Sequence, residues 1–195
     1  MIMERPEQQY IDLFTQYEAM ICRHSAEVLN APRSKAFADF ERLGFPTRKQ
    51  EDYKYTDVGR YFAPDYGLNL NRLEIPVNPY EVFKCDVPNM STSLYFVVND
   101  AFDRHDSPTA SLPEGVEFGS LCEIATRRPE LIKKYYAHLA DTSEDALAAF
   151  NTLFAQDGVV MYVPKGVVVE RPIQLVNILR ADVANFVNPP LVIIF

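Results

Sequence analysis

The sequence predicts an α+β fold in which a mainly helical region leads into a run of short strands. Apolar residues recur at spacings of three, four and seven over residues 7–30, as on one face of a helix. A second stripe of this kind runs over residues 142–155. After Gln156, short apolar runs alternate with turn signals such as Asp157-Gly158 and Pro164-Lys165-Gly166.

This change of period divides the chain into two expected parts. Residues 1–155 should form a mainly helical region with a short β element, and residues 156–195 the incomplete start of a β core. The first helix should end at Asn30-Ala31-Pro32, because the residue before a proline is disfavoured in helical conformation. A second short helix is expected over residues 34–42, with Gly44 as its C-terminal stop.

The stretch over residues 45–89 contains no long periodic segment. It is interrupted by prolines but is rich in phenylalanine and tyrosine, and disordered segments are poor in aromatic residues. We therefore expect an irregular, packed segment that lies across another surface.

Short strands and helices are expected between residues 93 and 155. The first is a strand over 93–99, buried on both faces, which a loop over 100–113 connects to a strand over 115–118. One or two helical turns over 120–126 follow. Two helices are then expected, over 129–138 and from Thr142 to Ala155. Thr142 and Asp145 have the spacing of a capping box, so Thr142 is expected to cap the last helix.

Four strands are expected in the last part of the chain, over residues 159–163, 166–170, 172–179 and 191–195. The connections are too short for parallel neighbours joined by helical crossovers, so the strands form either hairpins or the sides of β-helix coils. The β-helix explains the apolar end LVIIF better, because a coil buries its face only against the next coil. We therefore expect these residues to be the front part of a longer protein.

Composition excludes some classes of function. The chain has 195 residues and a net charge of −8, which argues against a nucleic-acid surface. The N-terminus lacks the apolar core of a signal peptide, and no apolar stretch is long enough for a transmembrane helix. Three widely spaced cysteines, Cys22, Cys85 and Cys122, form no CxxC motif, so we expect free thiols and a cytoplasmic location.

Two segments resemble the SufB/SufD family. LGFPTRKQEDYKYTDV (residues 43–58) is similar to a stretch near the N-terminus of that family, with Tyr53 where relatives commonly carry tryptophan. NTLFAQDGVVMYVPKGVVVERPIQL (residues 151–175) resembles the start of the family's β-helix. The chain as a whole looks like the N-terminal part of a SufD-like protein, with the weakest likeness over residues 65–92.

The resemblance implies a non-enzymatic scaffold for iron–sulfur cluster assembly. It implies an N-terminal helical region that leads into a right-handed β-helix, which is cut short in this chain. The implied partners are a SufB-like paralogue and a SufC-like ATPase, with no nucleic acid and no membrane. The family's cluster-related residues and ATPase-docking helices belong to later parts. We therefore assign no catalytic, cofactor-binding or metal-binding residue, and we expect no cofactor in this part of the chain.

Few residues suggest chemistry of their own. Cys22 and His24 are two apart on a predicted helix, so they point in different directions and cannot share a metal. Cys22 is expected to be buried and His24 peripheral. The three cysteines are better interpreted as small apolar residues than as iron ligands, since nothing in the sequence groups them. Asp103, His105 and Asp106 share a polar loop in which a carboxylate–histidine site is conceivable, although aspartate is also an ordinary turn residue.

Two further motifs have simple structural interpretations. Asp157-Gly158 should form the tight turn that starts the β region. Lys165 should lie in a turn exposed to solvent, because a phosphate-binding loop requires glycine before lysine and here lysine comes before glycine. The mixed charges from Arg48 to Lys54 should face solvent while interleaved aromatic residues hold the segment, and a partner surface is possible there.

Two other functions remain open from the sequence. A β-helix enzyme acting on polysaccharide would need grouped carboxylates, but residues 157–195 contain only Asp157, Glu170 and Asp182. The other alternative is a standalone binding module with a small antiparallel sheet.

Overall fold

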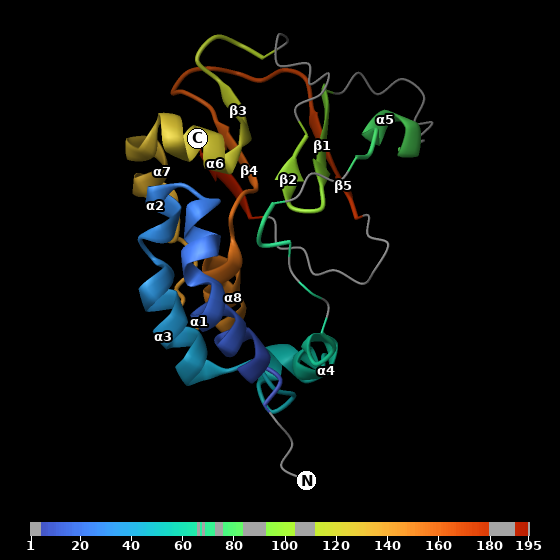
Figure 1. Cartoon of the computed structure of the whole chain (residues 1–195). Coiled ribbons are helices and arrows are strands. Elements are labelled where there is room, and N and C mark those ends of the chain that lie inside the picture. Colours follow the sequence, from blue (N-terminus) through green and yellow to red (C-terminus); the bar gives the residue numbers. More distant parts are fainter. Residues whose placement is uncertain are drawn as a thin grey trace.

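A helical layer and two small sheets lie at opposite ends of the molecule (Figure 1). The structure is a computed structural model that describes residues 5–65, 67, 69–72, 76–83, 93–103, 112–179 and 190–194. The helical layer consists of α1 (Gln8–Arg23), α2 (Glu27–Asn30), α3 (Arg33–Leu43) and α8 (Ala146–Phe154). This arrangement confirms the predicted α+β class.

Aromatic rings fill the core of the helical layer. The Tyr10 ring meets the rings of Phe45 and Phe150 edge-on, at centroid separations of 5.7 and 5.1 Å. Phe40, on α3, packs against both phenylalanines, of which Phe45 follows the end of α3 and Phe150 lies on α8. Because these rings arrive from distant parts of the sequence, their burial joins the first 45 residues to α8.

The prediction of one helix over residues 7–30 is wrong. α1 ends at Arg23, and Ala26 adopts an extended conformation (φ −83°, ψ 148°) before α2 begins. The Asn30 side-chain amide donates to the main-chain oxygen of Cys22 at 3.0 Å, and the Ser25 nitrogen donates to the same oxygen at 3.3 Å, so both bonds hold the turn where α1 ends. The second predicted helix, over residues 34–42, is confirmed: α3 contains this range and extends one residue further at each end.

The predicted cap of α8 is also wrong. Asp145 caps the helix, because its carboxylate accepts from the main-chain nitrogens of Leu147 at 2.8 Å and Ala148 at 3.1 Å. The Thr142 hydroxyl instead donates to Asp39 at 2.7 Å, across the contact between α3 and α8. A distant carboxylate has therefore displaced the local capping interaction.

The described parts of residues 45–89 form short helices separated by irregular chain. These are the 3-10 turn η1 (Glu51–Tyr53), α4 (Val58–Phe62) and α5 (Pro79–Val82). Phe45, Val58 and Leu70 are buried in the helical core. The prediction of a packed irregular segment is thus confirmed for residues 45–72, where they are described.

The first sheet has the strand order β2–β1–β5. β1 (Ser93–Val98) pairs with β2 (Ala101–Phe102) in an antiparallel hairpin and with β5 (Ile173–Ile178) in parallel. Both faces of β1 are covered, as predicted: Tyr95 packs on Phe118 at 4.3 Å and Phe96 on Phe83 at 5.8 Å between ring centroids.

The second sheet has the order β3–β4–β6. β3 (Glu117–Ser120) is antiparallel to β4 (Val159–Tyr162), and β6 (Leu191–Ile194) is parallel to β4. α6 (Leu121–Arg127) and α7 (Pro129–Tyr135) pack beside this sheet with α2, around Leu121, Ile132 and Val160. β3 starts two residues later than predicted because a turn, in which Val116 donates to Pro113, occupies the start of the predicted range.

Successive strands of the last part alternate between the two sheets. β4 and β6 are parallel neighbours, while β5, which lies between them in sequence, belongs to the other sheet. Within the described residues, β4 and β5 therefore do not form a hairpin. The chain thus places β4 in one sheet, β5 in the other and β6 back in the first.

The predicted strand over residues 166–170 is absent. This segment begins with a turn in which the Val167 nitrogen donates to Pro164, and it then connects β4 to β5 without strand pairing. Its valines satisfy strand propensity, but no described neighbour offers a hydrogen-bonding edge. The predicted strands over 159–163, 172–179 and 191–195 are confirmed within the residues described.

Candidate functional site

A polar junction holds the irregular segment against both sheets. The Arg72 guanidinium lies 2.6 Å from a carboxylate oxygen of Asp100, in the turn between β1 and β2, and 3.7 Å from one of Asp157, just before β4. Arg72 also donates to the main-chain oxygen of Asp100 at 3.2 Å. Arg72 has a φ of 55°, a conformation uncommon outside glycine. Arg72 forms its ion pairs with Asp100 and Asp157 while its main chain is in this conformation.

Asp157 does more than form the predicted turn. Its buried carboxylate accepts from the Ser120 hydroxyl at 2.8 Å and from the Cys122 main-chain nitrogen at 3.0 Å. The next residue, Gly158, approaches β6 so closely that a Cβ there would lie 2.2 Å from the main-chain oxygen of Pro190. The Asp-Gly pair thus fixes where α6, β4 and β6 meet.

Burial shapes the ionisation of the junction. It raises the pKa of Asp100, and the Arg72 charge opposes that rise. Burial, together with the neighbouring Asp157 charge, raises the pKa of the Cys122 thiol. A thiol with a raised pKa is mostly protonated at neutral pH, which disfavours both nucleophilic attack and metal binding.

A second polar centre surrounds the buried side chain of Arg33. Its guanidinium donates to the main-chain oxygens of Thr152 at 3.0 Å and Leu153 at 2.5 Å, and also to Ala155. Burial lowers the pKa of this arginine, and the Cys22 side chain is a neighbour that acts to raise it. These contacts satisfy carbonyls at the C-terminal end of α8, which would otherwise be buried without partners.

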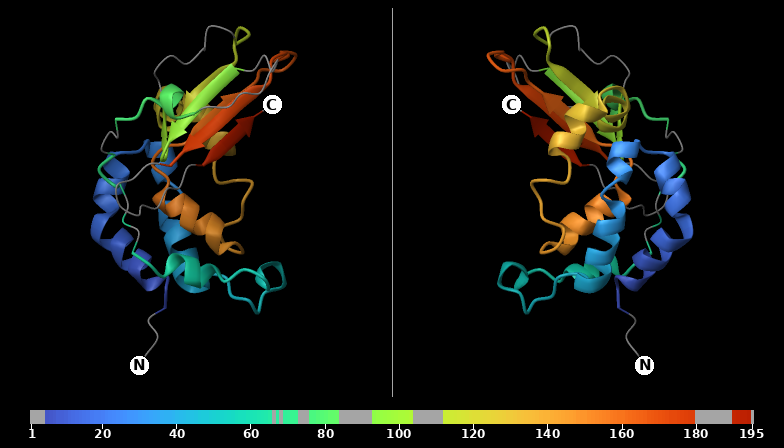
Figure 2. Two further views of the ribbon diagram at one scale, coloured as in Figure 1. Left: turned by 90° about the vertical axis from the view of Figure 1, so that its right-hand side faces the viewer. Right: turned by 90° about the vertical axis from the view of Figure 1, so that its left-hand side faces the viewer.

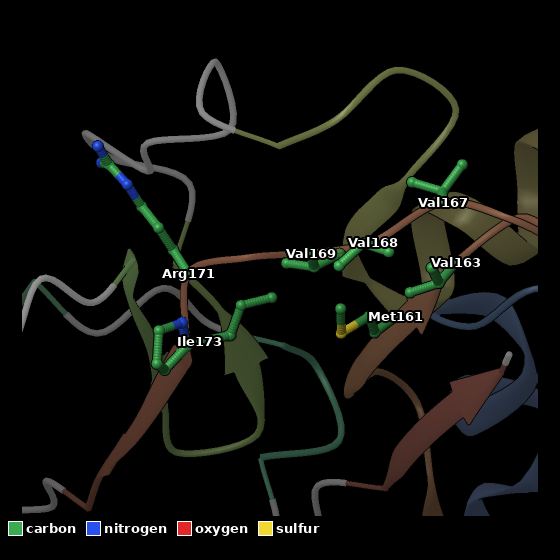
Figure 3. A pocket seen from close by; sticks show the side chains of 8 residues that line it. Met161, Val163, Val167, Val168, Val169, Arg171 and Ile173 are labelled. Atoms are coloured by element: carbon green, nitrogen blue, oxygen red, sulfur yellow. The ribbon is translucent and has the colours of Figure 1, made fainter.

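An apolar pocket of about 430 Å³ opens between β4 and β5. It is lined by Met161, Val163, Val167, Val168, Val169, Arg171, Pro172 and Ile173. Figure 3 shows Met161 projecting into the space between the strands, whereas the Arg171 side chain points away from it. The pocket is therefore suited to apolar side chains.

Exposed apolar residues continue from the pocket onto the sheet edges. β6 is the outer strand of its sheet in the described part of the chain, and Leu191 and Ile193 on it are 56% and 46% exposed. Val168, beside the pocket, is also exposed. Main-chain groups on such an edge can pair with a further strand. We call the pocket and the edge of β6 together the open apolar end.

The metal or catalytic candidates that the structure describes are not grouped. Cys22 and His24 are both half-buried, so Cys22 is less buried than predicted. Cys85, His105 and Asp106 lie outside the described residues, and Asp103 donates its main-chain nitrogen to Phe96 at 2.9 Å. Lys165 is exposed in a turn, as predicted. In the described part of the chain, no three His, Cys, Asp or Glu side chains are grouped so as to hold a metal ion.

Three residues of these centres were missed from the sequence. Arg33, Arg72 and Gln156 are polar residues to which the sequence analysis assigned no role, yet Arg33 and Gln156 are almost fully buried. The Gln156 amide donates to the main-chain oxygens of Leu70 at 3.0 Å and Ile21 at 3.3 Å. The signal that could have found Gln156 is its place directly before the Asp157-Gly158 turn, between an apolar helix and an apolar strand.

The fold and its open apolar end define this protein as an α+β protein with an exposed apolar strand edge in the part that the structure describes. None of the described helices is both long and apolar enough to cross a membrane. Residues 4–175 match the family described as the SufBD protein N-terminal region. The chain therefore belongs to the SufB/SufD family, whose curated relatives are named as iron–sulfur cluster assembly proteins.

Curated relatives support this assignment. The chain is 26% identical over 162 residues to the SufBD family protein ycf24 of Trieres chinensis, covering 77% of this chain and 33% of that protein. It is 30% identical over 152 residues to the chloroplastic protein ABCI8 of Arabidopsis thaliana, covering 72% of this chain and 27% of that protein. It is also 30% identical over 149 residues to ABCI9 of the same plant, covering 68% of this chain and 32% of that protein. The chain thus spans about a third of the length of these relatives.

Proposed function

We propose that this chain is the N-terminal part of a SufD-like scaffold subunit that has no catalytic activity of its own. Membership of a family named for iron–sulfur cluster assembly supports the role in assembly. The iron–sulfur cluster is then the cargo of the complete complex. The proposed location is the cytoplasm, and the proposed partners are a SufB-like paralogue and a SufC-like ATPase.

The parallel pairing of β4 with β6 around β5 is the observation that carries the architectural proposal. A chain that alternates between two sheets and returns in parallel can continue as a right-handed β-helix. In a longer protein, the next coil would pair with the edges of β5 and β6 and fill the pocket beside Met161. The helical layer would then flank the first coil, while the polar junction fixes its orientation.

Co-purification tests the scaffold role. The full-length protein, tagged, is expressed with its SufB-like and SufC-like neighbours under reducing conditions and at low salt. We expect a stable complex containing all three proteins. Recovery of the tagged protein alone, folded and monodisperse, would refute the proposal.

The part played by this region is tested separately. Residues 1–195 are expected to bind the SufC-like ATPase weakly or not at all, because the implied docking helices belong to later parts of the family's chains. Tight binding of this ATPase to residues 1–195 would contradict that expectation. A full-length chain carrying Leu139→Ala, at a side chain that is 89% exposed and outside the described cores, serves as a matched variant that should enter the complex normally.

The other two functions have less support. The relatives named above are iron–sulfur cluster assembly proteins and do not suggest a polysaccharide-acting enzyme, and the open apolar end lacks the grouped carboxylates that it would need among the described residues. A standalone module with an antiparallel sheet conflicts with the parallel pairs β1–β5 and β4–β6.

A further inference from the structure

The segment from Thr47 to Tyr61, here called the tyrosine segment, is an ordered projection from the helical layer. It is fixed at its base by Phe45 and Val58, both buried in the helical core, while Tyr53 packs against the same core. Figure 2 shows it extending beyond the helices, at the end of the molecule away from the sheets. Its position leaves most of its side chains in solvent.

Local hydrogen bonds hold the backbone of this segment in place. The Gln50 side-chain oxygen accepts from the Thr47 nitrogen at 3.0 Å, and the Gln50 main-chain oxygen accepts from Tyr53 at 3.0 Å. Tyr53 in turn accepts from the Thr56 nitrogen at 2.9 Å. A segment that is ordered before binding loses little conformational entropy when a partner arrives.

Two tyrosines stand out on this surface. Tyr55 is 87% exposed and Tyr61 is 65% exposed, although tyrosine usually buries most of its ring. Tyrosine and arginine are enriched at protein interfaces, where a rigid ring gives a large contact area at low entropic cost. Neither ring contributes to the described cores.

Only some of the charged side chains around these rings form ion pairs with described residues. Lys54 pairs with Glu51 and lies 5.2 Å above the Tyr55 ring, and Arg48 lies 3.9 Å from Asp57. Lys49 and Arg60, in contrast, form no ion pair with any described residue. The segment has four basic and three acidic residues in a chain of net charge −8. Asp52, also exposed, forms no ion pair with a described residue, so one positive charge remains in excess, and it favours an acidic partner.

We propose that the tyrosine segment is a docking surface for an acidic protein segment. Carboxylates of the partner would face Lys49 and Arg60, while its proline or aliphatic groups would stack on Tyr55 and Tyr61. The inference goes beyond the scaffold role and does not depend on it. Single-stranded nucleic acid also stacks on aromatic rings beside basic residues, but the strongly acidic remainder of the chain opposes it.

Selection from a random-peptide phage library on immobilised residues 1–195 tests the proposal. We expect the enriched peptides to be rich in aspartate and glutamate, with proline or aliphatic residues between them. The Tyr55→Ala/Tyr61→Ala variant should bind the enriched peptides about tenfold more weakly or worse, because interface energy is concentrated in a few aromatic anchors. Lys49→Glu should also weaken binding, and added salt should weaken binding to the unmodified chain.

Matched variants separate this surface from general stickiness. Leu139→Ala removes another highly exposed apolar side chain, and Lys134→Glu reverses another exposed lysine beside a tyrosine; both should leave peptide binding unchanged. Circular dichroism should show that every variant keeps its helical content. Peptides without acidic bias, equal binding by the double tyrosine variant, or stronger binding of a labelled oligothymidylate than of any peptide would each overturn the proposal.

Discussion

The guanidinium of Arg33 lies 3.0 Å from the main-chain oxygen of Thr152, at the C-terminal end of α8. The two residues are 119 positions apart, and the contact is buried. α3 begins at this arginine, so one side chain both starts a helix and completes the end of another. The helical layer is closed at this point by hydrogen bonding as well as by aromatic packing.

Replacing Arg33 with methionine should destabilise the protein by about 2–4 kcal/mol, because several buried carbonyls lose their only charged donor. Urea unfolding followed by circular dichroism measures the change. Arg42→Met is the matched control, since Arg42 is exposed and its bond to Ser143 lies at the surface. If Arg33→Met lowers the free energy of unfolding no more than Arg42→Met does, the buried contacts of Arg33 are dispensable.

The Arg72 junction should respond to pH in a particular direction. Arg72→Met removes the cation beside Asp100 and should cost roughly 3–5 kcal/mol at neutral pH, because it leaves carboxylates buried without their partner. Burial already raises the pKa of Asp100, and loss of Arg72 should raise it further. A carboxyl with a raised folded-state pKa destabilises the protein when ionised, so the variant should regain stability as pH falls through that pKa.

The double variant Arg72→Met/Asp100→Asn isolates the role of the Asp100 charge. It should be more stable at neutral pH than Arg72→Met and should lack the gain at lower pH. Urea unfolding of both variants at neutral and mildly acidic pH provides the comparison. An identical pH profile for the two would show that Asp100 is not the group responsible.

Much of the secondary structure was predictable because it depends on local pattern. The stripe of apolar residues predicted the cores of α1, α3 and α8, and the turn residues predicted where β4 and β5 begin. The failures are places where tertiary contacts override a local signal. Thr142 has a suitable capping spacing, but it faces Asp39 instead. Residues 166–170 have strand-forming valines, but none of the described residues pairs with them as a neighbouring strand.

The candidate site was less predictable than the fold. The Asp157-Gly158 turn was found, but its bonds to Ser120 and Cys122 depend on a strand pairing that no spacing in the sequence indicates. Arg33 and Arg72 resemble ordinary surface residues in sequence, and only the folded chain shows that Arg33 is buried and Arg72 half-buried. The open apolar end was expected from LVIIF, whereas its pocket also needs Met161 and Ile173 from separate sheets.

Asp39 should make stability depend on acid pH. Hydrogen bonds from Lys35, at 2.8 Å, and Thr142, at 2.7 Å, hold the pKa of Asp39 at about 2, below its ordinary value of 3.8. The resulting stabilisation is fully present above pH 3.8 and is lost as pH falls through about 2. Carboxyl-carbon NMR should locate this titration. Asp39→Asn should flatten the acid limb of the stability profile, and Asp141→Asn, at a more exposed neighbour, should alter it less.

Introducing a charge on the outer strand should reduce self-association of residues 1–195. Ile193 is 46% exposed on the edge of β6, and an apolar edge strand offers unpaired main-chain groups to other chains. We expect light scattering after size exclusion to show less oligomer for Ile193→Lys than for the unmodified chain. Leu139→Lys is the matched control, because Leu139 is 89% exposed but lies in a turn after α7. If both lysines reduce association equally, net charge is responsible and the edge of β6 is not.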